Sequence, residues 1–129
     1  MNNINMITIM ILNQDISRFS TAIQENEEKI KRLRKAKMSI ENLREDLINN
    51  KKNVFKPEFF STSWAGKHAK EHSNIRDSIA QSSTYIANQQ VGELLNEIDK
   101  KIKKLKDKNE SLLDSISVKQ REISRINNM

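Results

Sequence analysis

The sequence predicts an all-α protein built as an antiparallel, coiled-coil-like helical hairpin, and three observations lead to this prediction. The 129 residues include only two Gly and one Pro, and 31% of them are charged, a composition typical of long exposed helices. Apolar residues recur at alternating steps of three and four in both halves of the chain. Turn-forming residues are concentrated near the middle. At this length we expect one domain with a thin core.

Residues 1–13 are predicted to form a flexible N-terminal extension. Its apolar run, Met6 to Leu12, has seven residues, far fewer than the roughly 20 that cross a bilayer. No basic residue precedes the run and no small-residue cleavage site follows it, which argues against a secretory signal peptide. We therefore expect no membrane span and interpret the run as a frayed helix extension or a contact segment.

A helical hairpin domain is predicted over residues 14–126, and its first helix covers residues 14–50. Apolar residues follow this helix in a stripe that occupies two positions in seven, the narrow seam of a coiled coil rather than the broad face of a globular helix. The stripe contains a one-residue slip after Leu33. Its members are Ile16, Phe19, Ile23, Asn26, Ile30 and Leu33, followed by Ala36, Ile40, Leu43 and Leu47.

Residues 51–65 are predicted to form an aromatic hinge, which runs into the tripeptide Trp64-Ala65-Gly66. Gly66 permits a backbone conformation or a close approach that a Cβ atom would obstruct. The Trp64 ring can cover the open end of two packed helices, without contact to a partner. Alternatively, Trp64, Phe59 and Phe60 form an exposed anchor for a partner, since aromatic residues are enriched at binding hot spots.

The second arm is predicted as a helix over residues 66–87 and another over residues 89–126, with a kink or break near residues 82–92. At 1.5 Å per residue, the first helix is roughly 55 Å long and an unbroken second arm about 90 Å. The second arm therefore overhangs by roughly 35 Å and needs a partner, or it folds back near residue 88. Its first part carries a poor stripe of Ala65, Ala69, His72, Ile75, Ile79, Ser83 and Ile86, and its last part a richer one of Val91, Leu95 (or Leu94), Ile98, Ile102, Leu105, Asn109, Leu112, Ile116, Ile123 and Ile126.

Each of the two richer stripes carries one central asparagine, Asn26 and Asn109. A single buried Asn in a seam sets the register of two helices at a cost in stability. The alternative interpretation is that both are surface residues where the seam drifts around its helix.

Enzyme chemistry is not expected. The pattern His68-Ala69-Lys70-Glu71-His72 matches the spacing of one class of zinc peptidase, but a catalytic zinc needs a third protein ligand and a cleft that excludes water. We expect a solvated His68, a half-buried His72 and no metal site. The chain has no Cys, and its two glycines lie 26 positions apart, too far to build a phosphate-binding loop. No cofactor is therefore predicted.

Basic residues gather in two places, at residues 29–37 and 100–108, and the net charge is +6. Acids at i−4 are placed to pair with several of these bases, as in Glu25–Lys29, Glu27–Lys31, Glu28–Arg32, Glu97–Lys101 and Asp99–Lys103. A solvated helix face accounts for most of the charge. The remainder can steer docking onto an acidic partner, or bind the phosphates of a nucleic acid.

The chain resembles the WXG superfamily of small helical-hairpin proteins of type VII secretion, and more closely its YwqH-like branch, found beside LXG toxins in Gram-positive bacteria. The resemblance rests on Trp64-Ala65-Gly66 at mid-chain, followed by Ala69, between a seam with Ile30, Leu33, Ala36 and Lys37 and a seam with Leu95, Ile98, Ile102 and Leu105. It covers roughly residues 14 to 126. One departure is that Tyr85 is followed by Gln89, where the export signal of the family has an acid.

The resemblance implies a non-enzymatic protein that binds the helical N-terminal domain of an LXG toxin, as a targeting factor or chaperone for type VII export. It implies a hetero-oligomer, with or without a second small helical protein, in the bacterial cytoplasm or co-secreted with the toxin. The alternatives are a self-associating structural coiled coil and a basic nucleic-acid-binding helical protein. We expect partner binding through Trp64, Gly66, Phe59 and Phe60, and through seam residues left uncovered at Ile98, Ile102, Leu105, Leu112 and Ile116.

Overall fold

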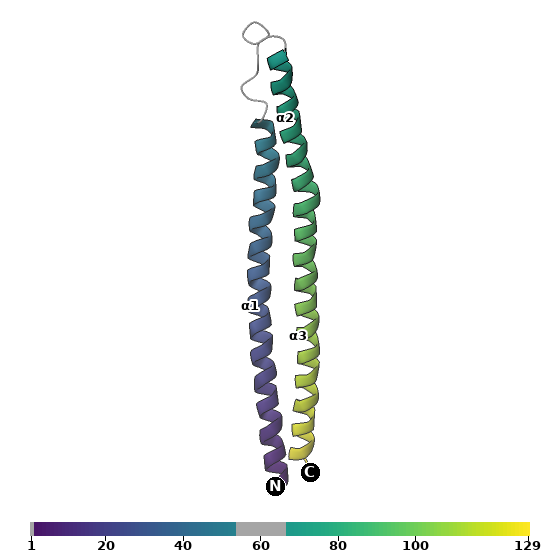
Figure 1. Cartoon of the computed structure of the whole chain (residues 1–129). Coiled ribbons are helices and arrows are strands. Elements are labelled where there is room, and N and C mark those ends of the chain that lie inside the picture. Colours follow the sequence, from purple (N-terminus) through teal and green to yellow (C-terminus); the bar gives the residue numbers. More distant parts are fainter. Residues whose placement is uncertain (1, 54–66) are drawn as a thin grey trace. The chain divides into compact units, whose positions relative to one another are not determined.

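The computed structural model describes residues 2–53 and 67–129, and all regular structure in these ranges is helical. Helix α1 covers Asn3–Asn53, α2 covers Lys67–Tyr85, a π-helix η1 covers Ile86–Gln90, and α3 covers Val91–Asn127 (Figure 1). The predicted all-α hairpin class is confirmed. The chain divides into two compact units, which we call unit 1, Met1–Arg34 with Asp99–Met129, and unit 2, Lys35–Ile98.

Helix α1 is longer than predicted, because it begins at Asn3 rather than at residue 14. The Oδ1 atom of Asn2 accepts a hydrogen bond from the backbone N–H of Asn5 at 2.7 Å, which is the geometry of a helix N-cap. The 51 residues of α1 correspond to about 77 Å, and the 61 residues from α2 to α3 to about 92 Å. The predicted difference of roughly 35 Å between the arms therefore falls to about 15 Å.

In unit 1 the start of α1 and the end of α3 pack as an antiparallel pair. The amide of Asn26 donates to Asn109 at 2.9 Å, and Asp15 forms an ion pair with Lys119 at 3.3 Å. Residue numbers thus fall along α3 as they rise along α1. On α3 the seam, the line of contact between the helices, keeps steps of three and four, typical of a left-handed supercoil. Its buried residues in unit 1 are Ile30, Ile102, Leu105, Asn109, Ile116 and Ile126.

In unit 2 the predicted one-residue slip of the α1 seam is wrong. The seam continues after Leu33 at unbroken steps of four and three through Lys37, Ile40, Arg44 and Leu47, all half-buried. Of the four residues in the slipped stripe, Ile40 and Leu47 stay in the seam, whereas Ala36 is exposed and Leu43 is 65% exposed. Lys and Arg can occupy seam positions because their methylene stems lie along apolar surface while the charged ends reach solvent.

The second arm does not fold back, because α2, η1 and α3 follow one another without a non-helical residue. The predicted site of distortion is correct, since η1 lies within residues 82–92. The backbone N–H of Val91 donates to the carbonyl of Ile86, five residues earlier, and such a wide turn accommodates an extra residue. The inward-facing positions accordingly spread to wider spacing through α2 and η1, at His72, Arg76, Ala80, Thr84, Ala87, Val91 and Leu95.

Candidate partner-binding surfaces

Four of the predicted partner-binding residues, Trp64, Gly66, Phe59 and Phe60, lie outside the described residues. Both interpretations of the aromatic hinge, the internal plug and the exposed anchor, therefore stay predictions. The described part of the chain offers other candidate surfaces.

The predicted seam residues are not left uncovered. Ile98, Ile102, Leu105 and Ile116 are between 4% and 8% exposed, and Leu112 is half-buried. Those that lie in unit 1 are enclosed by the chain's own α1, which the Asn26–Asn109 and Asp15–Lys119 contacts hold alongside α3. The expectation that these five residues are free to receive foreign helices is wrong for the isolated chain.

In unit 2, α2 and η1 expose the isoleucines that were predicted to face inward. Ile75, Ile79 and Ile86 are 58%, 47% and 38% exposed, and Leu94 in the following turns is 48% exposed. Steps of four and seven place the isoleucines on one side of a helix. Leu94 comes eight residues after Ile86. It lies on the same side of the helix because the wide turn of η1 takes up one extra residue. We call Ile75, Ile79, Ile86 and Leu94 the isoleucine face.

Along α2 and η1, the seam of unit 2 is made of small and polar side chains. Ala80 and Ala87 are buried on the second arm, together with Leu95 and Ile98. On α1, no described side chain between residues 35 and 50 is buried. Because stabilisation follows the apolar area removed from water, alanines contribute little. The sequence did contain a signal for this arrangement. Ala80 and Ala87 each follow an isoleucine by one residue, so small residues line the neighbouring side of the helix.

A second exposed apolar strip lies at the start of α1 in unit 1. Ile4, Ile7, Met10 and Ile11 are all more than half exposed. Ile7, Met10 and Ile11 belong to the run that was interpreted as a helix extension or a contact segment, Ile4 precedes it, and all four residues are helical. They are a competing candidate for a docking surface.

Asn26 and Asn109 contact each other inside the seam, as the register-setting interpretation requires and the surface interpretation does not. The Asn26 Nδ2 atom donates to Asn109 Oδ1 at 2.9 Å, and Asn109 is only 9% exposed. Two asparagine side chains can form this hydrogen bond only when they lie opposite each other along the two helices. A shifted register would lose the bond and is therefore less stable. The pair therefore holds unit 1 in one alignment.

A small polar cluster also supports unit 1, about three helical turns from this pair. Asp15 accepts hydrogen bonds from Arg18 on its own helix and from Lys119 on α3, and these bonds lower the pKa of its carboxyl below the ordinary value. The Lys119 ammonium also lies 5.7 Å from the centre of the Phe19 ring, within range for a cation–π interaction. Lys119 therefore links the two helices through both a charge and an aromatic face.

The histidine pattern does not form a metal centre in the described part of the chain. His68 is exposed and His72 is half-buried, as predicted. Within residues 2–53 and 67–129, no group of three or more His, Cys, Asp or Glu side chains could hold a metal ion.

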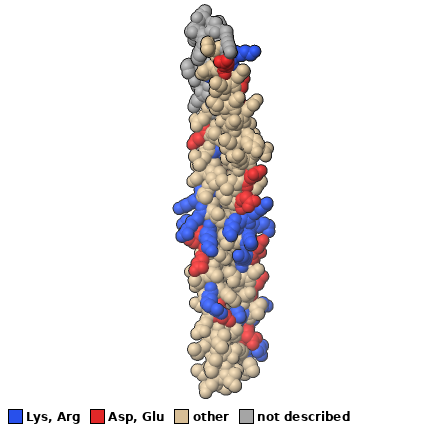
Figure 2. Space-filling view, in the orientation of Figure 1, with Lys and Arg blue, Asp and Glu red and all other residues tan. Residues whose placement is uncertain are grey.

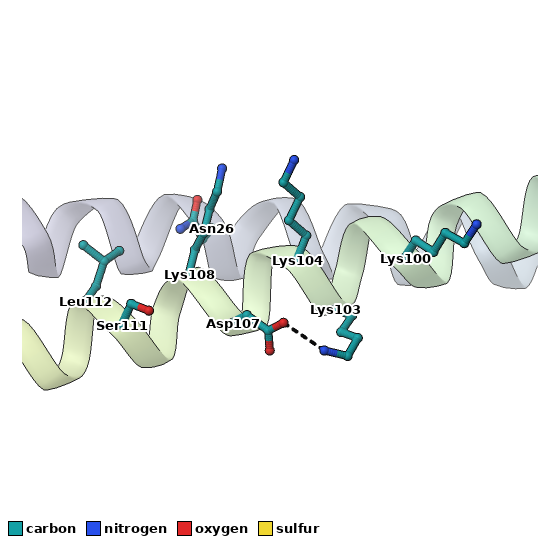
Figure 3. A pocket seen from close by; sticks show the side chains of 8 residues that line it. All are labelled: Asn26, Lys100, Lys103, Lys104, Asp107, Lys108, Ser111 and Leu112. Atoms are coloured by element: carbon teal, nitrogen blue, oxygen red, sulfur yellow. Dashed lines mark hydrogen bonds and ion pairs between the residues drawn. The ribbon is translucent and has the colours of Figure 1, made fainter.

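A shallow groove of about 640 Å³ opens on the surface of unit 1, beside the asparagine pair. Asn26 contributes from α1 and the other lining residues come from α3, among them four lysines. Lys104 and Lys108 extend toward the side on which Asn26 lies, whereas Lys103 turns away to pair with Asp107 at 2.9 Å (Figure 3). The lining residues are Asn26, Lys100, Lys103, Lys104, Asp107, Lys108, Ser111 and Leu112.

The predicted network of i,i+4 ion pairs is only partly formed. Glu28 and Arg32 are paired at 3.6 Å, whereas Lys103 pairs with Asp107 instead of Asp99. Among the described residues, Lys29 and Lys31 have no carboxylate within ion-pair distance. The positive charge near the groove is therefore less compensated than the sequence suggested.

Comparison with known proteins places the chain in a family. None of the described helices combines the length and apolar character needed to cross a membrane. No curated protein and no solved structure matches the chain. The family model of YwqH-like proteins, in contrast, matches residues 8–128. Because this match covers nearly the whole sequence, the protein belongs to the YwqH-like family.

Proposed function

We propose that this YwqH-like protein binds the helical N-terminal domain of an LXG-type toxin and acts as its targeting factor or chaperone for type VII export. The complex forms in the bacterial cytoplasm before export, and the chain has no catalytic role in it. Membership in the YwqH-like family supports the partner class. The isoleucine face is the single observation that carries the binding mode.

The isoleucine face fits the apolar face of a partner helix. Its residues recur on one side of the second arm, as expected for a helix that pairs with another helix. Unit 2 has only small buried side chains on α2, so covering Ile75 and Ile79 adds apolar burial that the isolated chain lacks. Unit 1 already buries its large seam residues and gains less from a partner. Binding therefore completes unit 2.

Co-expression of the chain with the N-terminal region of the adjacent LXG toxin tests this proposal, with size-exclusion chromatography and light scattering as the readout. We expect a stable heteromeric complex. A chain that forms homodimers and ignores the toxin region would instead support the self-associating coiled coil, and the proposed function would be wrong.

Paired substitutions test the assigned surface by calorimetric titration. Ile75→Gln with Ile79→Gln should raise the Kd by at least about tenfold, because exposed anchors that become buried dominate binding energy. The matched control is Leu113→Gln with Val118→Gln, two exposed apolar residues of unit 1, which should leave the Kd unchanged. If Ile7→Gln with Ile11→Gln abolishes binding and the unit 2 variant does not, the surface is the start of α1.

A further inference from the structure

Two segments of unit 1 account for the whole net positive charge of this protein. Residues 27–34 of α1 and 99–108 of α3 hold ten Lys or Arg and four Asp or Glu, a surplus of six, which equals the net charge of +6 for the whole chain. The remaining residues hold thirteen of each sign and are neutral in sum. We call these two segments the basic belt.

The fold brings the two segments of the basic belt together. The Asn26–Asn109 hydrogen bond fixes the antiparallel alignment next to them. The belt has three buried residues, Ile30 on α1 and Ile102 and Leu105 on α3. The charged residues between them therefore point outward. On the face that Figure 2 shows, Lys and Arg side chains are most crowded in one band, and fewer of them lie elsewhere.

Much of this charge has no internal counterion. Arg32 is paired with Glu28 and Lys103 with Asp107. In the described part of the chain, Lys104, Lys106 and Lys108 form no ion pair. A surplus of this kind on two neighbouring helices repels itself, so an external anionic partner would relieve it.

The groove beside Asn26 determines which kind of anion fits. Leu112 and the methylene stems of Lys104 and Lys108 give it an apolar lining with charged edges. Neither segment of the belt contains an aromatic residue on which a base could stack, and four carboxylates lie among its cations. The groove thus has an apolar floor with lysines at its edges. Such a groove fits a helix that has leucines on one side and carboxylates beside them, and it fits the phosphate backbone of a nucleic acid less well.

We propose that the basic belt and its groove form a second docking site, which binds an acidic amphipathic helix of the partner protein. This inference rests on the proposed function for the identity of that partner, and it is distinct from the isoleucine face in unit 2. The belt spans about 15 Å along α3, so it accommodates roughly three turns of a partner helix. Charge complementarity at such a site speeds association and sets its salt dependence.

Charge substitutions in two matched places test the inference with the toxin N-terminal region as the probe. Lys104→Gln with Lys108→Gln removes two lysines from the groove, and Lys31→Gln with Lys106→Gln removes two belt lysines that do not line it. The groove variant should raise the Kd about three- to tenfold at about 50 mM salt and by less at about 300 mM. The control should change the Kd by less than about twofold. Equal effects of the two variants, or none, would overturn the groove as the docking site.

A second probe separates this inference from the proposed function. A synthetic helical peptide of about 20 residues, with leucine on one face and glutamate on the other, is titrated by fluorescence anisotropy. Binding that weakens in the groove variant supports the acidic-helix site even if the toxin region does not bind. Tight binding of a DNA oligonucleotide with no binding of the peptide would overturn it, because the belt would then be a phosphate-binding surface.

Discussion

The two units of this hairpin are made from the same two arms but differ in what they bury. Unit 1 places isoleucines, leucines and the asparagine pair in its seam, and Leu105 is only 4% exposed. Unit 2 places Lys37, Arg44, Ala80 and Ala87 there and leaves Ile75, Ile79 and Ile86 exposed. We infer that unit 1 holds the fold, whereas unit 2 is kept incomplete for a partner.

The regularity of the seam separates the units in the same way. On α3 in unit 1, inward-facing residues keep strict steps of three and four from Ile102 to Ile126. In unit 2, the second arm uses wider steps and contains the π-helix Ile86–Gln90. Single π-turns inside α-helices occur frequently at functional sites. The irregular region is therefore also the one that presents the isoleucine face.

Single-residue deletions should give the largest contrast. Deleting Glu110, exposed on α3, rotates Leu112, Ile116 and Ile126 out of the seam and should cost at least about 5 kcal/mol of unfolding free energy. Deleting Asn88 within η1 removes the extra residue of the wide turn and should cost less than about 1 kcal/mol. Thermal unfolding followed by circular dichroism measures both. Equal losses would show that the seam of unit 1 does not dominate stability.

Side-chain truncations should sharpen the contrast. Leu105→Ala in unit 1 should destabilise the chain by about 2–5 kcal/mol, because it leaves a cavity in a packed seam. Leu43→Ala in unit 2 should change the stability by less than about 0.5 kcal/mol, since Leu43 is 65% exposed. Denaturant titrations give the two values. A large loss for Leu43→Ala would mean that unit 2 is covered in solution, by a second copy for example.

The asparagine pair should show a smaller, coupled effect. Asn109→Leu alone should cost about 1–3 kcal/mol, because the Asn26 amide loses its partner inside the seam. Asn26→Leu with Asn109→Leu should recover that loss or exceed it. A double-mutant cycle from chemical unfolding measures the coupling. Additive effects of the two substitutions would contradict a register-setting contact.

The effect of pH through Asp15 should be the smallest. Its pKa is lowered by hydrogen bonds from Arg18 and Lys119, so its stabilising contribution is present above the unfolded-state pKa and is lost as the pH falls through the lowered value. Asp15→Asn should therefore be less stable than the wild type at neutral pH, and the difference should shrink in acid. Unfolding midpoints across this range check the sign. A difference that grows in acid would contradict it.

The fold class was predictable because it follows from composition and from the spacing of large apolar residues. The same pattern located the asparagine pair, which meets across unit 1. The start of α1 was not predicted because it depends on the side chain of Asn2, which caps the helix, rather than on the apolar period. A cap residue followed by helix-compatible residues was the available signal.

The candidate surfaces were harder to predict, because hydrophobicity alone would place the isoleucine side of α2 in the seam, whereas the alanine side is the buried one. Ile75 and Ile79 are more apolar than Ala80, yet the alanine is the buried residue. Small side chains allow the helices to approach closely, and this preference does not appear in a hydrophobic period. The extra residue in η1 could not be predicted either, because a search for a fixed spacing of apolar residues does not allow the spacing to change within one helix.

Hydrogen–deuterium exchange of the chain alone and with the toxin N-terminal region tests the central claim most directly. We predict that amides at residues 70–98 exchange at least about tenfold faster than those at 102–126 in the free chain, because unit 2 opens locally at low cost. In the complex, residues 70–98 should become protected while 102–126 barely change. Equal slow exchange in both units of the free chain, with no change on mixing, would contradict the account.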